Sequence, residues 1–166
     1  MAKDNSFDVV SEVDLQEVDN AYQQTVKELV QRYDLKDSGA TIEFSKADKA
    51  FTLHAPSDFI GHQVIDVLNT KLVRRHIDLK SVAWGKPESA SGGTVRIKGE
   101  LVMGIEAELA RKINKDIRDK KFKSVKVQIE GEKLRVSSPS RDDLQAVIAF
   151  LKDADYGIPL QFTNYR

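Results

Sequence analysis

Apolar and polar residues alternate along two neighbouring stretches in the second half of the chain, residues 125–129 and 133–137. Glu130 and Gly131 separate them, and a glycine at a turn allows a positive φ, so the pattern predicts a β-hairpin. The next apolar residues recur at helical spacing up to Leu151, which predicts a helix. The same order of elements occurs 83 positions earlier, starting near residue 41. The chain is therefore predicted to contain two copies of one α/β unit.

Further predicted elements complete each copy. Residues 7–13 are predicted as a strand with apolar positions on both faces, and the following segment as an amphipathic helix that Asp14 caps and that runs to Tyr33. Short strands are predicted at 81–84, 94–99 and 160–163, and a helix that opens at Gly104. Both halves then have the order βαββαβ of ferredoxin-like domains. We expect an α+β fold, a tandem of two ferredoxin-like domains that resemble RNA-binding modules, each with a four-stranded antiparallel sheet.

The domain boundaries follow from one Gly- and Ser-rich stretch in mid-chain, residues 85–93, which is the predicted linker. The expected domains are therefore residues 1–84 and 94–166. One alternative stays open for the strand at 6–13. It pairs either within its own unit or with the other unit, because alternation specifies the faces of a strand and not its partners.

The zero net charge of the chain hides an asymmetry between its halves. Residues 1–83 hold 10 Lys/Arg and 14 Asp/Glu, net −4, whereas residues 84–166 hold 16 and 12, net +4. A basic half favours anionic partners such as nucleotides or RNA, although an ordinary solvated surface also carries a charge of this size. The chain has no cysteine, so disulfides and thiolate metal sites are excluded. Without an apolar run of signal-peptide or membrane-spanning length, we expect a cytoplasmic protein with no membrane partner.

The polar face of the predicted second sheet is the first candidate binding surface. If the apolar residues point to the helices, alternation places six polar residues on the opposite face: Arg96, Lys98, Lys126, Gln128, Lys133 and Arg135. The cations could bind phosphates and the Gln amide could read a base edge or a ribose. The alternative is an ordinary solvated sheet face. No aromatic residue is predicted on this face, so base stacking of the RNA-recognition type is not expected there.

Other charged clusters have simpler interpretations. Lys71, Arg74 and Arg75 end a predicted helix, where they either clamp a phosphate or stabilise the negative end of the helix dipole. Asp142 and Asp143 lie in the first turn of the last helix, where acids favour the helix terminus rather than paired acid–base catalysis. The three histidines lack metal-ligand spacing, and no nucleophile–base pair, Walker loop or dinucleotide fingerprint occurs. We therefore expect no enzyme activity and no cofactor.

Seven stretches of the sequence carry a family resemblance, and they are residues 6–14, 17–21, 32–36, 57–59, 123–131, 141–145 and 159–166. Together they resemble the YajQ family of bacterial proteins. This resemblance implies a tandem of ferredoxin-like domains and a nucleotide-binding function, with RNA and cyclic di-GMP as proposed ligands and no enzyme activity. Five motif positions have side chains suited to phosphate or base contacts: Arg141, Gln145, Gln161, Asn164 and Arg166.

Two function hypotheses follow. The first is a protein that binds a nucleotide, RNA or cyclic di-GMP without catalysis, by electrostatic capture of the phosphates. A symmetric dinucleotide would suit a cleft between two related domains. The second is a protein-interaction adaptor in the regulation of gene expression, motivated by the acidic first half beside a basic second half.

Overall fold

The computed structural model describes residues 4–122 and 124–166, and the chain divides into two compact units. Unit 1 joins the segment that ends at Glu12 to the segment from Met103 onward, and unit 2 is Val13–Val102. Lys123, the first residue of one motif quoted above, lies outside the described residues. Each unit is an antiparallel sheet with two helices on one face, so the α+β tandem of ferredoxin-like domains is confirmed.

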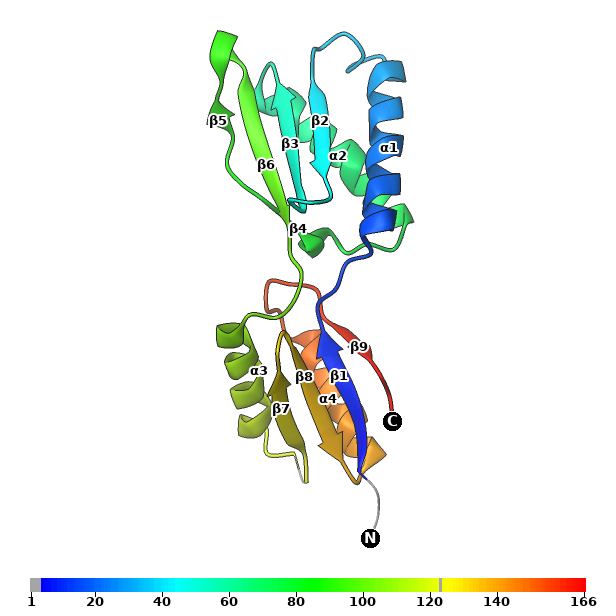
Figure 1. The fold of residues 1–166 in the computed structure, drawn as a ribbon, viewed down its shortest axis with the longest axis vertical. Helices are drawn as coiled ribbons and strands as arrows, with labels where there is room; N and C mark the ends of the chain where they lie inside the picture. Colours follow the sequence, from blue (N-terminus) through cyan, green and yellow to red (C-terminus); the bar gives the residue numbers. More distant parts are fainter. Residues whose placement is uncertain (1–3, 123) are drawn as a thin grey trace. The chain divides into compact units, whose positions relative to one another are not determined.

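Unit 2 contains two long helices and the larger sheet. The helices are α1 (Leu15–Gln31) and α2 (Asp58–Arg74). The strands, in the spatial order β2-β3-β6-β4, are β2 (Thr41–Ser45), β3 (Ala50–Ala55), β6 (Val95–Leu101) and β4 (Val82–Trp84). The short strand β5 (Glu88–Ser89) also pairs with β6, and two 3₁₀ turns lie at Leu79–Ser81 and Ser91–Gly93. In Figure 1, α2 lies behind this sheet and α1 lies on its right-hand side, next to β2.

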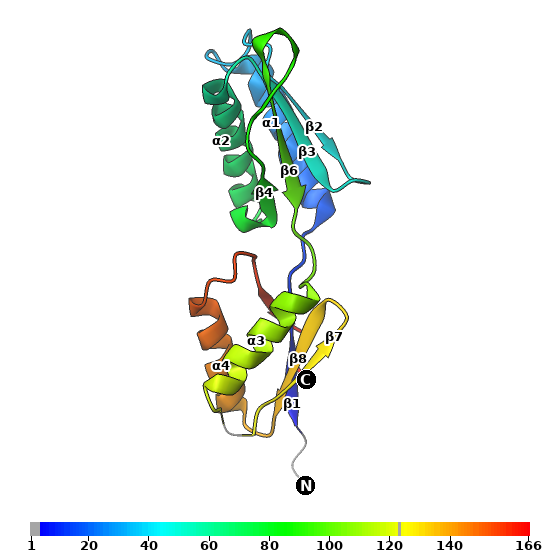
Figure 2. The ribbon, with the colours of Figure 1, turned by 90° about the vertical axis from the view of Figure 1, so that its left-hand side faces the viewer.

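Unit 1 has the same architecture with a four-stranded sheet. Its helices are α3 (Ala107–Asp119) and α4 (Arg141–Asp153), which cover the same face of the sheet (Figure 2). Its strands, in the order β7-β8-β1-β9, are β7 (Lys126–Glu130), β8 (Lys133–Ser138), β1 (Asn5–Val10) and β9 (Gln161–Thr163). All neighbouring strands run antiparallel.

The first strand of each βαββαβ repeat lies in the other repeat's sheet. Strand β1 is followed in sequence by α1 of unit 2, yet it pairs with β8 and β9 of unit 1. Strand β6 is followed by α3 of unit 1, yet it pairs with β3 and β4 of unit 2. The chain therefore passes between the units twice, after Glu12 and after Val102.

This exchange changes the expected domain boundaries of 1–84 and 94–166. Strand β6, expected to open the second domain, is a central strand of unit 2, and β5 with the 3₁₀ turn after it occupies the predicted linker at 85–93. For the strand at 6–13, the alternative that the structure adopts is pairing with the other unit.

Side-chain caps and buried apolar faces explain why these elements form. Asp14 caps α1 by accepting from the backbone N–H groups of Gln16 and Glu17, and serines cap α2 and α4 in the same way. Each unit has its own core, built around Phe51 and Leu53 in unit 2 and around Phe7 and Leu134 in unit 1. Burial of one such side chain contributes roughly 1.5–3 kcal/mol.

The charge asymmetry of the two sequence halves is not an asymmetry of the two units. Unit 2 holds 12 Lys/Arg and 13 Asp/Glu, net −1, and unit 1 holds 14 and 13, net +1. The exchange of strands and the transfer of residues 84–102 to unit 2 cause this difference. Within residues 4–122 and 124–166, no helix has the length and apolar character needed to cross a membrane.

Candidate functional site

A buried carboxylate lies on the sheet face that the helices of unit 1 leave open. The neighbours of Asp8 in β1 point to the helices, so Asp8 points to the opposite face, and its side chain is only 1% exposed. Three side chains converge on it. Arg135 Nε donates to Oδ1 at 3.2 Å, and both Lys133 Nζ, at 3.3 Å, and Asn164 Nδ2, at 2.8 Å, donate to Oδ2.

These contacts keep Asp8 ionised. Burial disfavours its charged form, but the hydrogen bonds from Asn164, Arg135 and Lys133 outweigh burial and hold the pKa of Asp8 below its usual value. Two predicted phosphate-binding cations and one predicted amide are therefore engaged within the protein. A ligand phosphate on this face would compete with Asp8 for both cations.

Of the other four residues predicted on this face, only Lys126 and Gln128 lie in unit 1. Lys126 and Gln128 lie beside Ser137 and Arg135 in the β7–β8 ladder and are exposed, as expected. The partner of Gln128 on the other strand of the hairpin, Arg135, belongs to the Asp8 cluster.

Arg96 and Lys98 lie in the other unit, so the prediction of a single face with all six residues is wrong. Both are on β6, where Arg96 pairs with His54 and Lys98 with Thr52 of β3. Arg96 Nη2 also lies 3.2 Å from Glu88 Oε2 of β5. The prediction failed because it assigned residues 94–99 and residues 125–137 to the same sheet.

A hollow of about 360 Å³ opens in unit 1 between α4, β1 and the end of the chain. Buried Phe7, Leu144 and Ile148 contribute its apolar surface. The remaining lining is polar or aromatic and consists of Asn5, Ser6, Arg141, Gln145, Tyr165 and Arg166. This volume is within the range of small-ligand sites.

The hollow exists because the chain end pairs with β1. The backbone N–H groups of Ser6 and Arg166 each donate to the carbonyl of the other residue, at 3.1 and 2.9 Å. Asn164 has a positive φ of 54°, a conformation that Asn tolerates better than most residues, and this local turn brings the last two residues beside β1. Three of the stretches that carry the family resemblance, 6–14, 141–145 and 159–166, thus meet at the hollow.

The chemistry of the lining suits a ligand with both phosphate and an aromatic ring. Arg141 and Gln145 are one turn apart on α4, and Arg141 Nε donates to Asn5 Oδ1 at 3.4 Å. Among the described residues, the terminal N–H groups of Arg141 have no partner. A guanidinium can bind a phosphate through two parallel hydrogen bonds. Tyr165 is 63% exposed, and the centroid of its ring lies 6.2 Å from that of Phe7. An exposed ring held in this way is a platform for base stacking.

The hollow thus brings together Arg141, Gln145 and Arg166, three of the five side chains selected from the motifs. The other two lie elsewhere. Asn164 binds Asp8, and Gln161 Oε1 accepts from the backbone N–H of Glu12 at 2.8 Å.

Sequence reasoning missed Asn5 and Tyr165 as members of the site. The prediction about stacking residues concerned only the open sheet face. Tyr165 instead packs against Phe7, whose side chain points to the helices. The closing motif itself contains Tyr165 next to Arg166, and this pair is the signal that could have found it.

The fold and this hollow define a class of protein, tandem ferredoxin-like domains in which one unit carries a hollow lined by two arginines and an exposed tyrosine. A family model described as "Nucleotide-binding protein YajQ-like" matches residues 5–166. The chain belongs to this YajQ-like family, as the resemblance of the motifs indicates.

Relatives of similar length support the same membership. A protein of Nocardia farcinica (strain IFM 10152) is 56% identical over 163 residues, which cover 98% of this chain and 99% of the relative. A protein of Alkaliphilus oremlandii (strain OhILAs) is 50% identical over 166 residues, and one of Chloroherpeton thalassium (strain ATCC 35110 / GB-78) is 46% identical over 166; both alignments cover 100% of each chain. All three relatives are named "Nucleotide-binding protein".

Proposed function

We propose that this protein binds a nucleotide in the hollow of unit 1 and does not catalyse a reaction on it. Arg141 and Arg166 bind the phosphates, the base stacks on Tyr165, and Gln145 contacts the base or the ribose. The observation that carries the proposal is the combination of two arginines and one exposed aromatic ring beside an apolar surface. The names of the relatives support the same class of ligand.

The composition of the hollow favours binding without chemistry. Among the described residues that line it, none is an Asp, Glu, His, Lys or Cys, so the lining lacks the usual general bases and activated nucleophiles. The same feature leaves the charge of the two arginines available for a phosphate.

The size of the hollow, about 360 Å³, suits one nucleotide unit. A free mononucleotide, one half of cyclic di-GMP or one residue of a single-stranded RNA could supply this unit. The alternative adaptor role loses the support of the charge asymmetry, because the net charges of the units are only −1 and +1. A cytoplasmic location stays a prediction from the sequence.

Isothermal titration of the nucleic-acid-free protein with GTP, cyclic di-GMP and a short single-stranded RNA tests the proposal. We expect at least one of them to bind, with an affinity that falls as salt is added. Arg141→Ala should weaken that binding by about tenfold, which corresponds to about 1.4 kcal/mol.

A matched control is Arg111→Ala on α3. Arg111 is exposed and, in the part of the chain that the structure describes, has no polar partner. If Arg111→Ala weakens binding as much as Arg141→Ala does, only the net charge of the protein matters and the hollow is not the site. If none of the three ligands binds, the proposed function is excluded.

A further inference from the structure

A second basic hollow lies in unit 2, where the end of α2 meets α1. Its volume is about 580 Å³, and six residues line it: Glu17, Gln24, Lys71, Arg74, Arg75 and His76. Three cations face one carboxylate, so the lining has a formal net charge of +2 with His neutral. Nothing in the proposed nucleotide hollow of unit 1 contributes to it.

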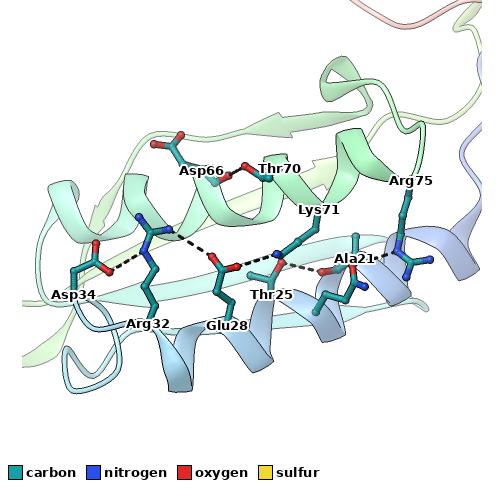
Figure 3. Close-up of polar contacts among 10 residues, drawn as sticks. Ala21, Thr25, Glu28, Arg32, Asp34, Asp66, Thr70, Lys71 and Arg75 are labelled. Carbon is teal, nitrogen blue, oxygen red and sulfur yellow. Dashed lines mark hydrogen bonds and ion pairs between the residues drawn. The ribbon is translucent and has the colours of Figure 1, made fainter.

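Contacts between the helices hold two of these cations in place. Lys71 lies in the last turn of α2, Arg75 is the residue that follows the helix, and both side chains extend toward α1 (Figure 3). Lys71 Nζ lies 2.8 Å from Glu28 Oε1, and Arg75 Nη1 lies 2.8 Å from Glu17 Oε2. The hydrogen bond from Lys71 is the main cause of a pKa of Glu28 below its usual value. Because their positions are fixed, both cations lose little conformational freedom when a ligand binds.

Backbone N–H groups, and not these cations, cap two carbonyls at the end of the helix. The carbonyl of Leu72 accepts from the backbone N–H groups of Arg75 and Ile77, both at 3.0 Å, and that of Val73 accepts from His76, also at 3.0 Å. His76 adopts a positive φ of 61°, which is typical of a helix C-terminus closed by its own backbone.

Two side chains of the lining are available to a ligand. In the described part of the chain, neither the guanidinium of Arg74 nor the imidazole of His76 has a polar partner, and both residues are exposed. They lie beside Lys71 and Arg75, whose charged groups are held in place by the ion pairs with Glu28 and Glu17.

We propose that this hollow binds a diphosphate group, free or as part of a larger ligand. The oxygens of a diphosphate spread over several positions, so they can meet Arg74, Arg75 and Lys71 together, whereas a single phosphate reaches fewer of them. The Gln24 amide is a further donor. The Glu17 carboxylate competes with the ligand for Arg75, so it limits the affinity. This site is independent of the proposed function of unit 1.

Site-resolved NMR of the ¹⁵N-labelled full chain titrated with inorganic pyrophosphate tests the proposal. We expect the amide cross-peaks of Glu17, Gln24 and residues 71–77 to shift together and to saturate. Arg74→Ala should weaken this binding roughly threefold, the size expected for an exposed ion pair. Glu17→Gln should strengthen it roughly threefold, because glutamine keeps the hydrogen-bond acceptor and removes the competing charge.

The control is Lys27→Ala, an exposed cation of α1 outside the hollow, which should leave the affinity unchanged. A merely structural role of Glu17 predicts no tighter binding in Glu17→Gln. The proposal would be overturned if the cross-peaks of residues 71–77 do not shift, or if Lys27→Ala and Arg74→Ala reduce the affinity for pyrophosphate equally. Failure here would leave the effect of Arg141→Ala on nucleotide binding untouched, so the two proposals are tested separately.

Discussion

At the scale of single residues, position in the sheet decides which polar side chains are available for a ligand. Alternation correctly predicts that Lys133 and Arg135 point away from the helices, but it cannot predict that Asp8 of a distant strand lies between them. Lys133 and Arg135, which were predicted to bind phosphate because of their charge, are therefore already bound to a carboxylate of the protein itself. Arg141 and Arg166, selected from motifs instead, line the hollow.

Asp8→Asn tests whether the cluster on the open face stabilises unit 1. Because the pKa of Asp8 is lowered in the folded state, its stabilising contribution is present above the pKa of the unfolded chain and is lost as the pH falls through the lower folded value. We expect Asp8→Asn to reduce the free energy of unfolding by about 1–3 kcal/mol at neutral pH. The difference from the unmodified protein should shrink toward about pH 3.

Urea titration at the two pH values measures this effect, with Asp37→Asn as the control. Asp37 is exposed and, among the described residues, has no polar partner. Equal stability of Asp8→Asn and the unmodified protein at neutral pH would show that the cluster contributes nothing net.

Tyr165 gives the second prediction at this scale. If the base stacks on its ring, Tyr165→Leu should weaken nucleotide binding by about 1–3 kcal/mol, whereas Tyr165→Phe keeps the ring and most of the affinity. Calorimetric titration of both variants separates stacking from the hydroxyl group. Equal losses in the two variants would argue against stacking.

At the scale of helices and strands, most of the architecture follows from local pattern. The β7–β8 hairpin forms as predicted, with its turn at Gly131 and Glu132, one residue beyond the predicted Glu130 and Gly131, and Asp14 caps α1 as predicted. The ends are less exact. Helix α3 begins at Ala107 rather than at Gly104, because Gly104 has a φ of 84°. Its N–H donates to the backbone carbonyl of Ser11, which is distant in sequence. Periodicity does not report such a tertiary hydrogen bond.

Close packing of β4 on β6 predicts an effect of Gly99→Ala. A Cβ at Gly99 would lie 2.7 Å from two ring atoms of Trp84, and that ring stacks on Phe51 with centroids 5.9 Å apart. Because the ring packs against Phe51 and cannot move aside freely, we expect a loss of about 1–3 kcal/mol of stability.

Trp84 is the only tryptophan of the chain, so its fluorescence during urea unfolding reports on unit 2. Gly85→Ala is the control, since a Cβ there meets its nearest atom at 3.5 Å, an ordinary contact. A Gly99→Ala protein as stable as the control would mean that the ring moves aside at no cost.

At the scale of the whole molecule, the sequence could not predict the exchange of the first strands. Strands β1 and β6 occupy equivalent central positions in two sheets of the same order, and the apolar residues of each strand fit a central position in either sheet. Alternation defines which side chains share a face, whereas partner choice depends on contacts far apart in sequence. The net charges of the units differ from those of the sequence halves for the same reason.

Two fragments test this arrangement. Residues 13–102 contain every strand of the unit 2 sheet, whereas residues 1–84, the domain expected from sequence, lack β6 between β3 and β4. We expect fragment 13–102 to unfold cooperatively in urea. Fragment 1–84 should show no cooperative transition, because β3 keeps β2 but loses β6, β4 loses its partner strand and the core loses Ile97. Cooperative folding of fragment 1–84 would contradict the exchanged connectivity.

The most direct test of the central claim is a site-resolved NMR titration of the ¹⁵N-labelled full chain with GTP, repeated with Arg141→Ala. The account predicts saturable shifts for Asn5 to Phe7, Arg141 to Gln145, and Tyr165 with Arg166, all weakened in the variant. Shifts confined to Lys126 and Gln128 on the open sheet face, or to unit 2, would contradict a nucleotide site in the hollow.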